Sequence, residues 1–486
     1  MYSQGDEHMT TEHLLSDFLT YWSQFVAAVN EVLWGSVLMY GLVAVGLFFT
    51  IYLGAPQFIR FGPAVRQVFG KLYKYQHTDR DGKSISSFQA LAVAVSAQVG
   101  TGNVAGVATA IMAGGPGAIF WMWLSALFGM STIFAEAVLA QKYRVEVAGK
   151  FIGGPAFYIS RGLQSYIGRT NAKIFAGIFA VIVIISVGFI GSMAQSNSIA
   201  TAVNNAFGIS PVVCGLLIAL FAGAIFIGGI HRIARFAQLI VPIMAAVYIL
   251  CALVILFLFA EHILPMIQHI VIGAFNPQAL GGGLLGVTMK EAVRFGVARG
   301  LFSNEAGMGT TPHAHATALV AHPVLQGFTA FIGVFVDTIL VCTSTALIIL
   351  LTGADQLGLD GAMVTQEAFH IAFGAIGPKI IAICLTFFAF TTVISWYYFG
   401  ESNVRYLFKS NAVLYTYRAL VLVFIVLGTL GTVDLIWSMI DMFNGIMVLP
   451  NLIALIILHK EVKDILRDYD KKRQDGIPLY DYDSVA

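Results

Sequence analysis

The sequence predicts an all-α protein that crosses a membrane about eleven times, and three observations lead to this fold class. Of the 486 residues, 58% are hydrophobic and only 11% are charged. So few charged side chains cannot cover a soluble surface, since soluble domains carry about 25% charged residues. The second observation is a series of long apolar runs, and the third is the placement of Lys and Arg between them.

Apolar runs long enough to span a membrane recur along the whole chain. A hydrocarbon core about 30 Å thick requires about 20 apolar residues in a helix. The eleven runs lie near residues 33–54, 86–113, 118–141, 174–198, 210–229, 236–259, 286–320, 325–352, 379–404, 413–430 and 435–458. We expect one helical span in each run.

Lys and Arg occupy every second connection between these runs. They are Arg60, Arg66, Lys71, Lys74, Arg80, Lys83, Lys142, Arg144, Lys150, Arg161, Arg169, Lys173, Arg232, Arg235, Arg405 and Lys409, with a basic tail from Lys460 to Arg473. The alternate connections 199–209 and 260–285 contain none. Because basic loops stay in the cytoplasm, the pattern predicts an outside N-terminus and a cytoplasmic C-terminus in a bacterial inner membrane. Residues 1–32 contain no Lys or Arg, so no signal peptide is expected.

Two of the spans are interrupted by glycine and polar residues at bilayer depth. Span 86–113 contains QVGTGN at 98–103, and span 286–320 contains a glycine-rich stretch at 300–309, followed by Pro312. Such backbone is tolerated in a membrane only where it lines a cavity or is enclosed by protein. Glycines that only allow close helix packing are the alternative. A paired interruption in two halves is instead the pattern of a transporter binding site.

Each interrupted span begins a set of five, and five is an odd number. The second set must therefore enter the membrane from the opposite side, which predicts an inverted five-plus-five repeat after one extra N-terminal helix. The expected segments are an extracytoplasmic N-terminal segment at 1–32, the leading helix and a cytoplasmic interfacial helix at 33–85, the repeats at 86–259 and 286–458, and a cytoplasmic tail at 459–486.

A broken helix offers free N–H groups at one end and free carbonyl groups at the other. A small zwitterion needs both. We expect its carboxylate near Gly100–Asn103 and its ammonium near the carbonyl groups of Leu301–Glu305. Glycines at the contact favour a small substrate.

Three stretches resemble one known family. GGPGAIFWMWLSALFG at 114–129, SAQVGTGNVAGVATA at 96–110 and GLFSNEAGMGTTPHAHATA at 300–318 are similar to motifs of the alanine or glycine:cation symporter family (sodium:alanine symporters). The resemblance extends from about residue 30 to 460. It implies an eleven-helix, LeuT-like fold and uptake of alanine or glycine driven by co-transported sodium.

The candidate site residues come from the two breaks and from two other spans. For the substrate they are Gly100, Thr101, Gly102, Asn103, Gln195, Asn304 and Trp396, and for sodium Ala97, Gly100, Thr391, Thr392 and Ser395. Hydroxyl groups one turn apart, together with carbonyl groups of the first break, suit a hard cation. In the LeuT-like fold that the resemblance implies, a sodium site lies between the corresponding helices. Back-bonding of these hydroxyl groups within their own helix is the alternative.

Ionisable residues within the spans are further functional candidates, because charge at bilayer depth is unfavourable. They are Glu136, Arg299, Glu305, Asp337 and Asp441. Lys290, Arg294 and Arg299 lie on the outer half of their span, against the charge rule. Either a vestibule lining or a partnered cluster would explain them.

Several other functions are not expected. The near-neutral net charge gives no basic face for nucleic acid, and no GxxxxGK[ST] motif supports use of ATP. No H-E-x-x-H or G-x-S-x-G motif indicates an enzyme. A proton-coupled symporter of the same fold stays open, as does, less favoured, a channel built on similar broken helices.

Overall fold

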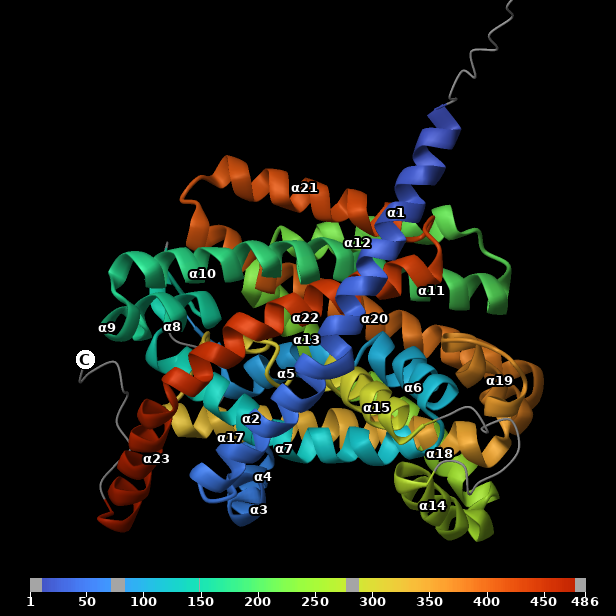
Figure 1. The fold of residues 1–486 in the computed structure, drawn as a ribbon, viewed down its shortest axis with the longest axis horizontal. Helices are drawn as coiled ribbons and strands as arrows, with labels where there is room; N and C mark the ends of the chain where they lie inside the picture. Colours follow the sequence, from blue (N-terminus) through green and yellow to red (C-terminus); the bar gives the residue numbers. More distant parts are fainter. Residues whose placement is uncertain (1–10, 71–83, 148, 277–287, 477–486) are drawn as a thin grey trace, which may run out of the picture.

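The computed structural model describes residues 11–70, 84–147, 149–276 and 288–476, and nearly every element in them is a helix (Figure 1). The first half contains α1 Thr11–Val32, α2 Leu38–Tyr52, α3 Pro56–Ile59, α4 Phe61–Phe69, α5 Ser87–Gln98, α6 Val107–Gly114, α7 Gly117–Lys142, α8 Pro155–Gly162, α9 Gln164–Ile167, α10 Arg169–Val183, α11 Ser192–Phe207, α12 Pro211–Phe226, α13 Gly229–Leu258 and α14 Ala260–Phe275.

The second half repeats this order of elements. It contains α15 Met289–Asn304, α16 Pro312–His315, α17 Pro323–Val334, α18 Thr343–Thr352, α19 Ala362–Phe373, α20 Gly377–Leu407, α21 Asn411–Gly428, α22 Val433–Ile457 and α23 His459–Gln474. Both halves begin with a broken span and a long span, continue with a short helix (α8 or α19), and end with three further spans. This order is the one that the predicted repeat requires.

Helices of membrane-spanning length account for most of the predicted runs. Eight helices in the described residues are long and apolar enough to cross a bilayer, and the pair Ser87–Gln98 and Gly102–Gly114, bent by 48°, is a ninth candidate. α12 is apolar but has only 16 residues. The run at 286–320 is divided into α15, an irregular segment and α16. Each of the eleven predicted runs therefore contains a helix, although the number of spans stays a prediction.

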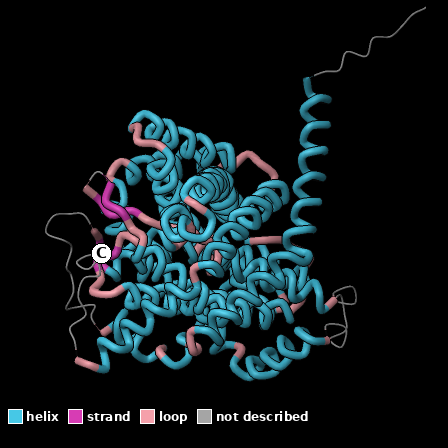
Figure 2. The backbone as a smooth tube through the Cα atoms, turned by 60° about the vertical axis from the view of Figure 1, so that its left-hand side comes forward, coloured by secondary structure: helices cyan, strands magenta, loops and turns pink. Residues whose placement is uncertain are grey.

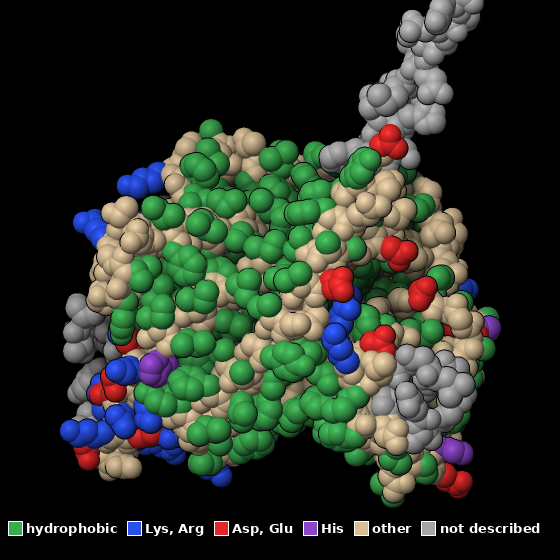
Figure 3. Space-filling view, in the orientation of Figure 1, with side chains coloured by type: hydrophobic (Ala, Val, Ile, Leu, Met, Phe, Trp, Pro, Cys, Tyr) green, Lys and Arg blue, Asp and Glu red, His purple; other side chains and the backbone are tan. Residues whose placement is uncertain are grey.

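Large apolar side chains cover the outside of the helix bundle as well as its interior. Phe257 and Ile51 are 81% and 73% exposed, whereas Trp396, Tyr158 and Tyr248 are fully buried. Hydrophobic side chains cover much of the face in Figure 3, and Lys and Arg gather near the end where α23 lies. An apolar belt with charge at its edge is the surface of a protein embedded in lipid.

The two broken spans are tied together at one end. β1 (Ile85–Ser86) precedes α5, and it pairs in parallel with β4 (Ala318–Leu319), which follows α16. Gln141 Nε2, at the end of α7, donates to the carbonyl oxygen of Ala318 at 3.0 Å. A second pair, β2 (Val145–Val147) with β3 (Lys150–Ile152), is antiparallel. Figure 2 shows the strands on the side of the molecule where the chain ends.

Helices extend beyond three of the predicted boundaries. α1 begins at Thr11 and continues through a π-helical segment into α2, so the leading helix is longer than the run at 33–54. It projects from the body in Figures 1 and 2. α14 occupies much of the connection expected at 260–285, and the tail forms α23. The predicted interfacial helix is present as α3 and α4. The ends of the predicted N-terminal segment (1–10) and tail (477–486), and residues 71–83, lie outside the described residues.

Candidate substrate and cation site

The first break lies between α5 and α6 and is capped by neutral side chains. Val99 leaves the helical conformation, with φ −78° and ψ 86°. The N–H of Gly100 donates to Asn103 Oδ1 at 2.9 Å, and the N–H of Thr101 donates to Gln195 Oε1 at 3.2 Å. Backbone groups left without partners at this depth would be strongly unfavourable. Four of the predicted substrate residues therefore lie together.

Gly100 is the point at which the first break touches two other helices. A Cβ atom at this position would lie 2.4 Å from Thr392 Oγ1 of α20 and 3.2 Å from Gln195 Oε1 of α11. Real Cβ atoms essentially never approach other heavy atoms within 3.0 Å. Glycine is therefore required for this close contact, which brings a backbone turn, a hydroxyl group and an amide oxygen together.

The hydroxyl groups of α20 reach the last turn of α5. Thr392 Oγ1 lies 2.9 Å from the carbonyl oxygen of Ser96 and 3.1 Å from that of Phe388, so it can donate to either. The hydroxyl oxygens of Ser395 and Ser96 are 2.5 Å apart. Ser96 is not among the residues predicted from the sequence, although a hydroxyl in the last turn before the break was an available signal.

Thr391 lies apart from this group. Its hydroxyl donates to the carbonyl oxygen of Phe388 at 2.9 Å and is 3.8 Å from Met244 Sδ of α13. Both threonines can back-bond to Phe388 of their own helix, but only Thr392 also reaches the carbonyl oxygen of Ser96 at the first break. Ser395 faces the same break through the hydroxyl of Ser96. Ala97, the remaining predicted cation residue, is buried in α5.

The second break, between α15 and α16, has an unusual backbone that a carboxylate holds. Glu305, Gly307 and Gly309 all have positive φ, at 57°, 92° and 81°. The N–H groups of Gly307 and Gly309 donate to the two oxygens of Glu136, at 3.0 and 2.9 Å. Asn451 Nδ2 also donates to Glu136, at 2.6 Å. Charge-assisted bonds of this kind are stronger than neutral ones, so Glu136 fixes the shape of the break.

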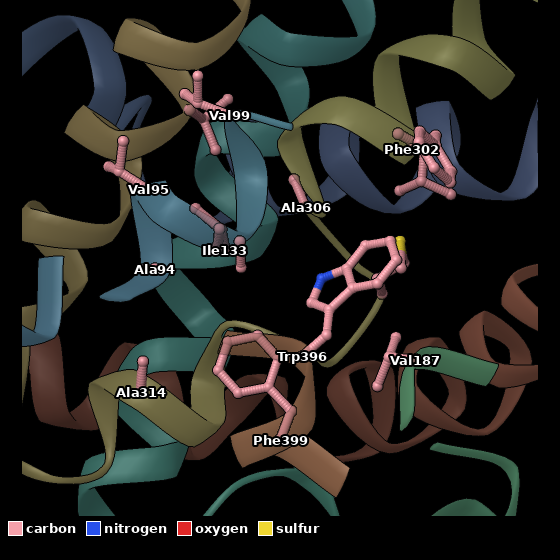
Figure 4. Packing of buried hydrophobic residues seen from close by; sticks show 14 of the residues in the cluster. Ala94, Val95, Val99, Ile133, Val187, Phe302, Ala306, Ala314, Trp396 and Phe399 are labelled. Atoms are coloured by element: carbon pink, nitrogen blue, oxygen red, sulfur yellow. The ribbon is translucent and has the colours of Figure 1, made fainter. Parts of the chain in front are cut away.

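Trp396 is anchored to the second break by its indole nitrogen. Nε1 donates to Glu305 Oε1 at 2.5 Å, and Thr310 Oγ1 donates to the other oxygen of Glu305 at 2.5 Å. The indole packs on Gly191, where a Cβ would lie 2.4 Å from the ring, and meets Phe302 edge-on at 6.0 Å. Figure 4 shows Trp396 at the centre of this apolar cluster. The indole ring of Trp396 is therefore held by a hydrogen bond at its nitrogen and by packing against Gly191 and Phe302.

A third buried carboxylate, Asp337, joins the two breaks. Asn103 Nδ2 donates to Asp337 Oδ1 at 2.6 Å, and the hydroxyl groups of Ser303 and Thr338 donate to Oδ2 at 3.0 and 2.8 Å. A Cβ at Gly102 would lie 3.0 Å from Ser303 Cα, so this glycine lets the breaks approach each other. The hydroxyl of Ser303 was not among the predicted site groups, although its carbonyl lies in the range expected for the ammonium group. Its hydroxyl within the interrupted stretch was the signal.

The side chain of Asn304 forms hydrogen bonds with residues next to the second break. Nδ2 donates to Thr338 Oγ1 at 3.2 Å, and Oδ1 accepts from the N–H of Ala306 at 3.0 Å. Its carbonyl oxygen accepts from Gln98 Nε2 at 2.7 Å. Asn304 therefore supports the second break, with its side chain turned toward Thr338 and not toward Gly100.

The three carboxylates of the site have hydrogen-bond donors around them but no cationic partner among the described residues. Within the described ranges, no Lys, Arg or His forms an ion pair with Glu136, Glu305 or Asp337, and each of the three side chains is fully buried. Unpaired negative charge at this depth is unfavourable unless a proton or a cation accompanies it. A proton or a cation bound beside these carboxylates would therefore be stabilised.

Comparison with known proteins gives a consistent result. A family model described as the sodium:alanine symporter family matches residues 19–481. The chain is 40% identical to the sodium/alanine symporter AgcS of Methanococcus maripaludis, over 92% of this chain and 97% of the relative. It is also 40% identical to the putative sodium/proton-dependent alanine carrier protein YrbD of Bacillus subtilis, over 94% and 95%. A solved Na⁺-coupled sialic acid symporter has a similar fold, with a TM-score of 0.52 at 14% identity, covering 88% of this chain and 86% of that chain.

Proposed function

Because the chain belongs to the sodium:alanine symporter family, we propose that it couples sodium entry to the uptake of a small neutral amino acid, alanine or glycine. The family consists of transporters, not enzymes. The observation that carries the proposal is the meeting of the two broken helices at Gly102, next to Gly100, which lies against the amide of Gln195 and the hydroxyl of Thr392.

The proposed substrate lies against the first break. Its carboxylate accepts from the N–H groups of Gly100 and Thr101, displacing the neutral oxygens of Asn103 and Gln195. A carboxylate is a stronger acceptor than an amide oxygen, which favours this exchange. Trp396 limits the length of the substrate side chain, because Glu305 and Gly191 hold its ring in place.

The proposed sodium ion lies between α5 and α20. Thr392 and Ser395 supply hydroxyl oxygens, and the last carbonyl groups of α5, near Ala97 and Gly100, complete the coordination. A hydroxyl that donates its hydrogen keeps two lone pairs, so the contacts of Thr392 with Ser96 and Phe388 are compatible with this role. Unwound carbonyl groups that coordinate sodium are typical of such transporters.

We propose an outside N-terminus and a cytoplasmic C-terminus in the inner membrane. The support is the clustering of Lys and Arg at the end of the molecule where α23 lies. If one sodium ion enters with each neutral substrate, one net charge crosses per cycle. That charge contributes about 2.3 kcal/mol per 100 mV of membrane potential.

Purified protein in liposomes tests the proposal. We expect saturable uptake of labelled alanine or glycine that requires an inward sodium gradient and rises with an inside-negative potential. Uptake that persists when choline replaces sodium and instead follows a proton gradient would identify the proton-coupled alternative, which the three buried carboxylates also permit. A continuous conductance without saturation would identify a channel.

A further inference from the structure

A polar cavity lies between the leading helix and the second repeat, away from the proposed substrate and cation positions. Its volume is about 270 Å³, and α1, α15 and α22 form its walls. Its polar lining consists of Asn30, Trp34, Arg294, Arg299, Ser438 and Asp441. Figure 3 shows Lys and Arg beside Asp and Glu at a hollow in this region of the surface. The cavity can hold an amino acid of alanine's size together with water.

One charged pair forms the wall of the cavity toward the interior. Arg299 donates from Nη1 and Nη2 to the two oxygens of Asp441, both at 2.7 Å. The arginine side chain is only 7% exposed. Its Nε is buried and has no hydrogen-bond partner among the described residues. The pair is therefore built into the fold.

A second cation, Arg294, lies five residues earlier on α15. It is half-buried, and its guanidinium contacts the ring of Phe295 at 5.5 Å. Within the described part of the chain it forms no ion pair. Two arginines and one aspartate give the cavity a net positive charge, which favours a carboxylate.

The leading helix supplies the complementary acceptor. Asn30 Nδ2 donates to the carbonyl oxygen of Ser438 at 2.8 Å, while its Oδ1 is buried and has no partner among the described residues. Trp34 Nε1 donates to the carbonyl oxygen of Asp441 at 3.1 Å, which ties the leading helix to α22. The cavity thus offers guanidinium donors for a carboxylate, and the Asn30 and Asp441 oxygens for an ammonium group.

An aromatic layer separates this cavity from the central site. The guanidinium of Arg299 lies 5.2 Å from the ring centre of Trp437, which packs on Phe302 at 5.1 Å. Phe302 in turn contacts Trp396. In the proposed orientation, the cavity is on the outer side of this layer, where a substrate arrives.

We propose that this cavity is an entry site that binds the zwitterionic amino acid before it reaches the central site. Arg294 binds the carboxylate, and Asn30 together with Asp441 receives the ammonium group. The inference rests on the proposed function, since it concerns the same substrate. It also accounts for the arginines on the outer half of this span: Arg299 is a partnered residue, and Arg294 lines a vestibule.

Transport kinetics of Arg294→Gln test the entry site, with Lys290→Gln as the matched control. Lys290 is exposed, carries the same charge and lies one turn before Arg294 on α15. We expect Arg294→Gln to raise the half-saturating alanine concentration roughly threefold to tenfold and to retain the maximal rate. Lys290→Gln should change neither. Equal effects of both variants would show that Arg294 only contributes to the general positive charge of this surface, and would overturn the proposal.

Tryptophan fluorescence tests binding directly, because Trp34 lines the cavity. In the Gly100→Ala background, where the central contact is blocked, alanine should still change the fluorescence at high concentration and without sodium. Arg294→Gln should move this change to roughly threefold to tenfold higher alanine concentration, and Trp34→Phe should remove it. The same titration of the wild-type chain in sodium-free buffer covers the case in which Gly100→Ala does not fold. No response in either protein would refute the entry site. The proposed function fails separately, if the wild-type protein does not transport any small neutral amino acid.

Discussion

The two broken helices solve the same problem with different chemistry. At the first break, neutral amide oxygens of Asn103 and Gln195 accept the free N–H groups. At the second, the carboxylate of Glu136 accepts two of them, and Asn451 supports it. A carboxylate from a ligand can displace a neutral acceptor, but it would be repelled by one already charged. The difference supports the proposal that the substrate carboxylate binds at the first break, and it gives Glu136 a structural role at the second.

The largest effect is expected from removing the carboxylate that holds the second break. Glu136→Ala leaves the N–H groups of Gly307 and Gly309 without their acceptor in a buried position. Each unsatisfied group costs about 1–3 kcal/mol. We expect a clear fall in the unfolding temperature of the detergent-solubilised protein, measured by differential scanning fluorimetry. Glu261→Gln, an exposed carboxylate on α14, is the control. A Glu136→Ala protein as stable as wild type would show that the break keeps its shape by itself.

The next effect concerns the space at the first break. Gly100→Ala would place a Cβ 2.4 Å from Thr392 Oγ1. Overpacking of this kind costs about 1–3 kcal/mol, so we expect uptake of both alanine and glycine to fall roughly tenfold or more. Gly35→Ala is a matched control in the leading helix, because no atom lies within 4 Å of its added Cβ. Normal uptake by Gly100→Ala would place the ligand contact elsewhere.

Substitution of the two adjacent threonines, Thr391 and Thr392, tests whether the hydroxyl of Thr392 binds the cation or only back-bonds within α20. We expect Thr392→Ala to raise the half-saturating sodium concentration roughly tenfold, which corresponds to about 1.4 kcal/mol. Because sodium and substrate binding are linked, substrate affinity should fall at low sodium and recover at high sodium. Thr391→Ala, whose hydroxyl faces α13, should leave the sodium dependence unchanged. Identical behaviour of the two variants in sodium titrations of uptake would move the cation toward Glu305 or Asp337.

The smallest effect is expected from a carboxylate near water. Asp470 pairs with Arg60 at 2.6 Å, and the two side chains are 35% and 21% exposed. Exposed ion pairs contribute about 0–1 kcal/mol, so Asp470→Asn should barely change the unfolding temperature. Comparing the unfolding temperatures of Asp470→Asn and Glu136→Ala shows how much more a buried carboxylate contributes to stability than one near water. A larger loss than that of Glu136→Ala would mean that the Arg60–Asp470 pair stabilises the docking of α23 far more than an exposed ion pair does.

The membrane class, the family and the position of both breaks could be predicted because their signals are local. The length of an apolar run can be read directly from the sequence, and the polar, glycine-rich stretch QVGTGN inside such a run indicates that the helix is interrupted there. The family expectation is confirmed over residues 19–481. The nearly all-helical fold of a membrane transporter is confirmed as well. The length of the leading helix was underestimated, because the acidic residues within α1 concealed its continuation.

The partners of the breaks were decided only by the tertiary structure. Sequence analysis marked Glu136, Glu305 and Asp337 as unusual charges but could not assign their contacts. Glu136 lies 171 residues from Gly307, and Asp337 lies 234 residues from Asn103. Local sequence determines that a helix must stop and which N–H groups become free. Which side chain accepts hydrogen bonds from these N–H groups depends on how helices that are distant in sequence pack together. A local sequence pattern does not contain this information.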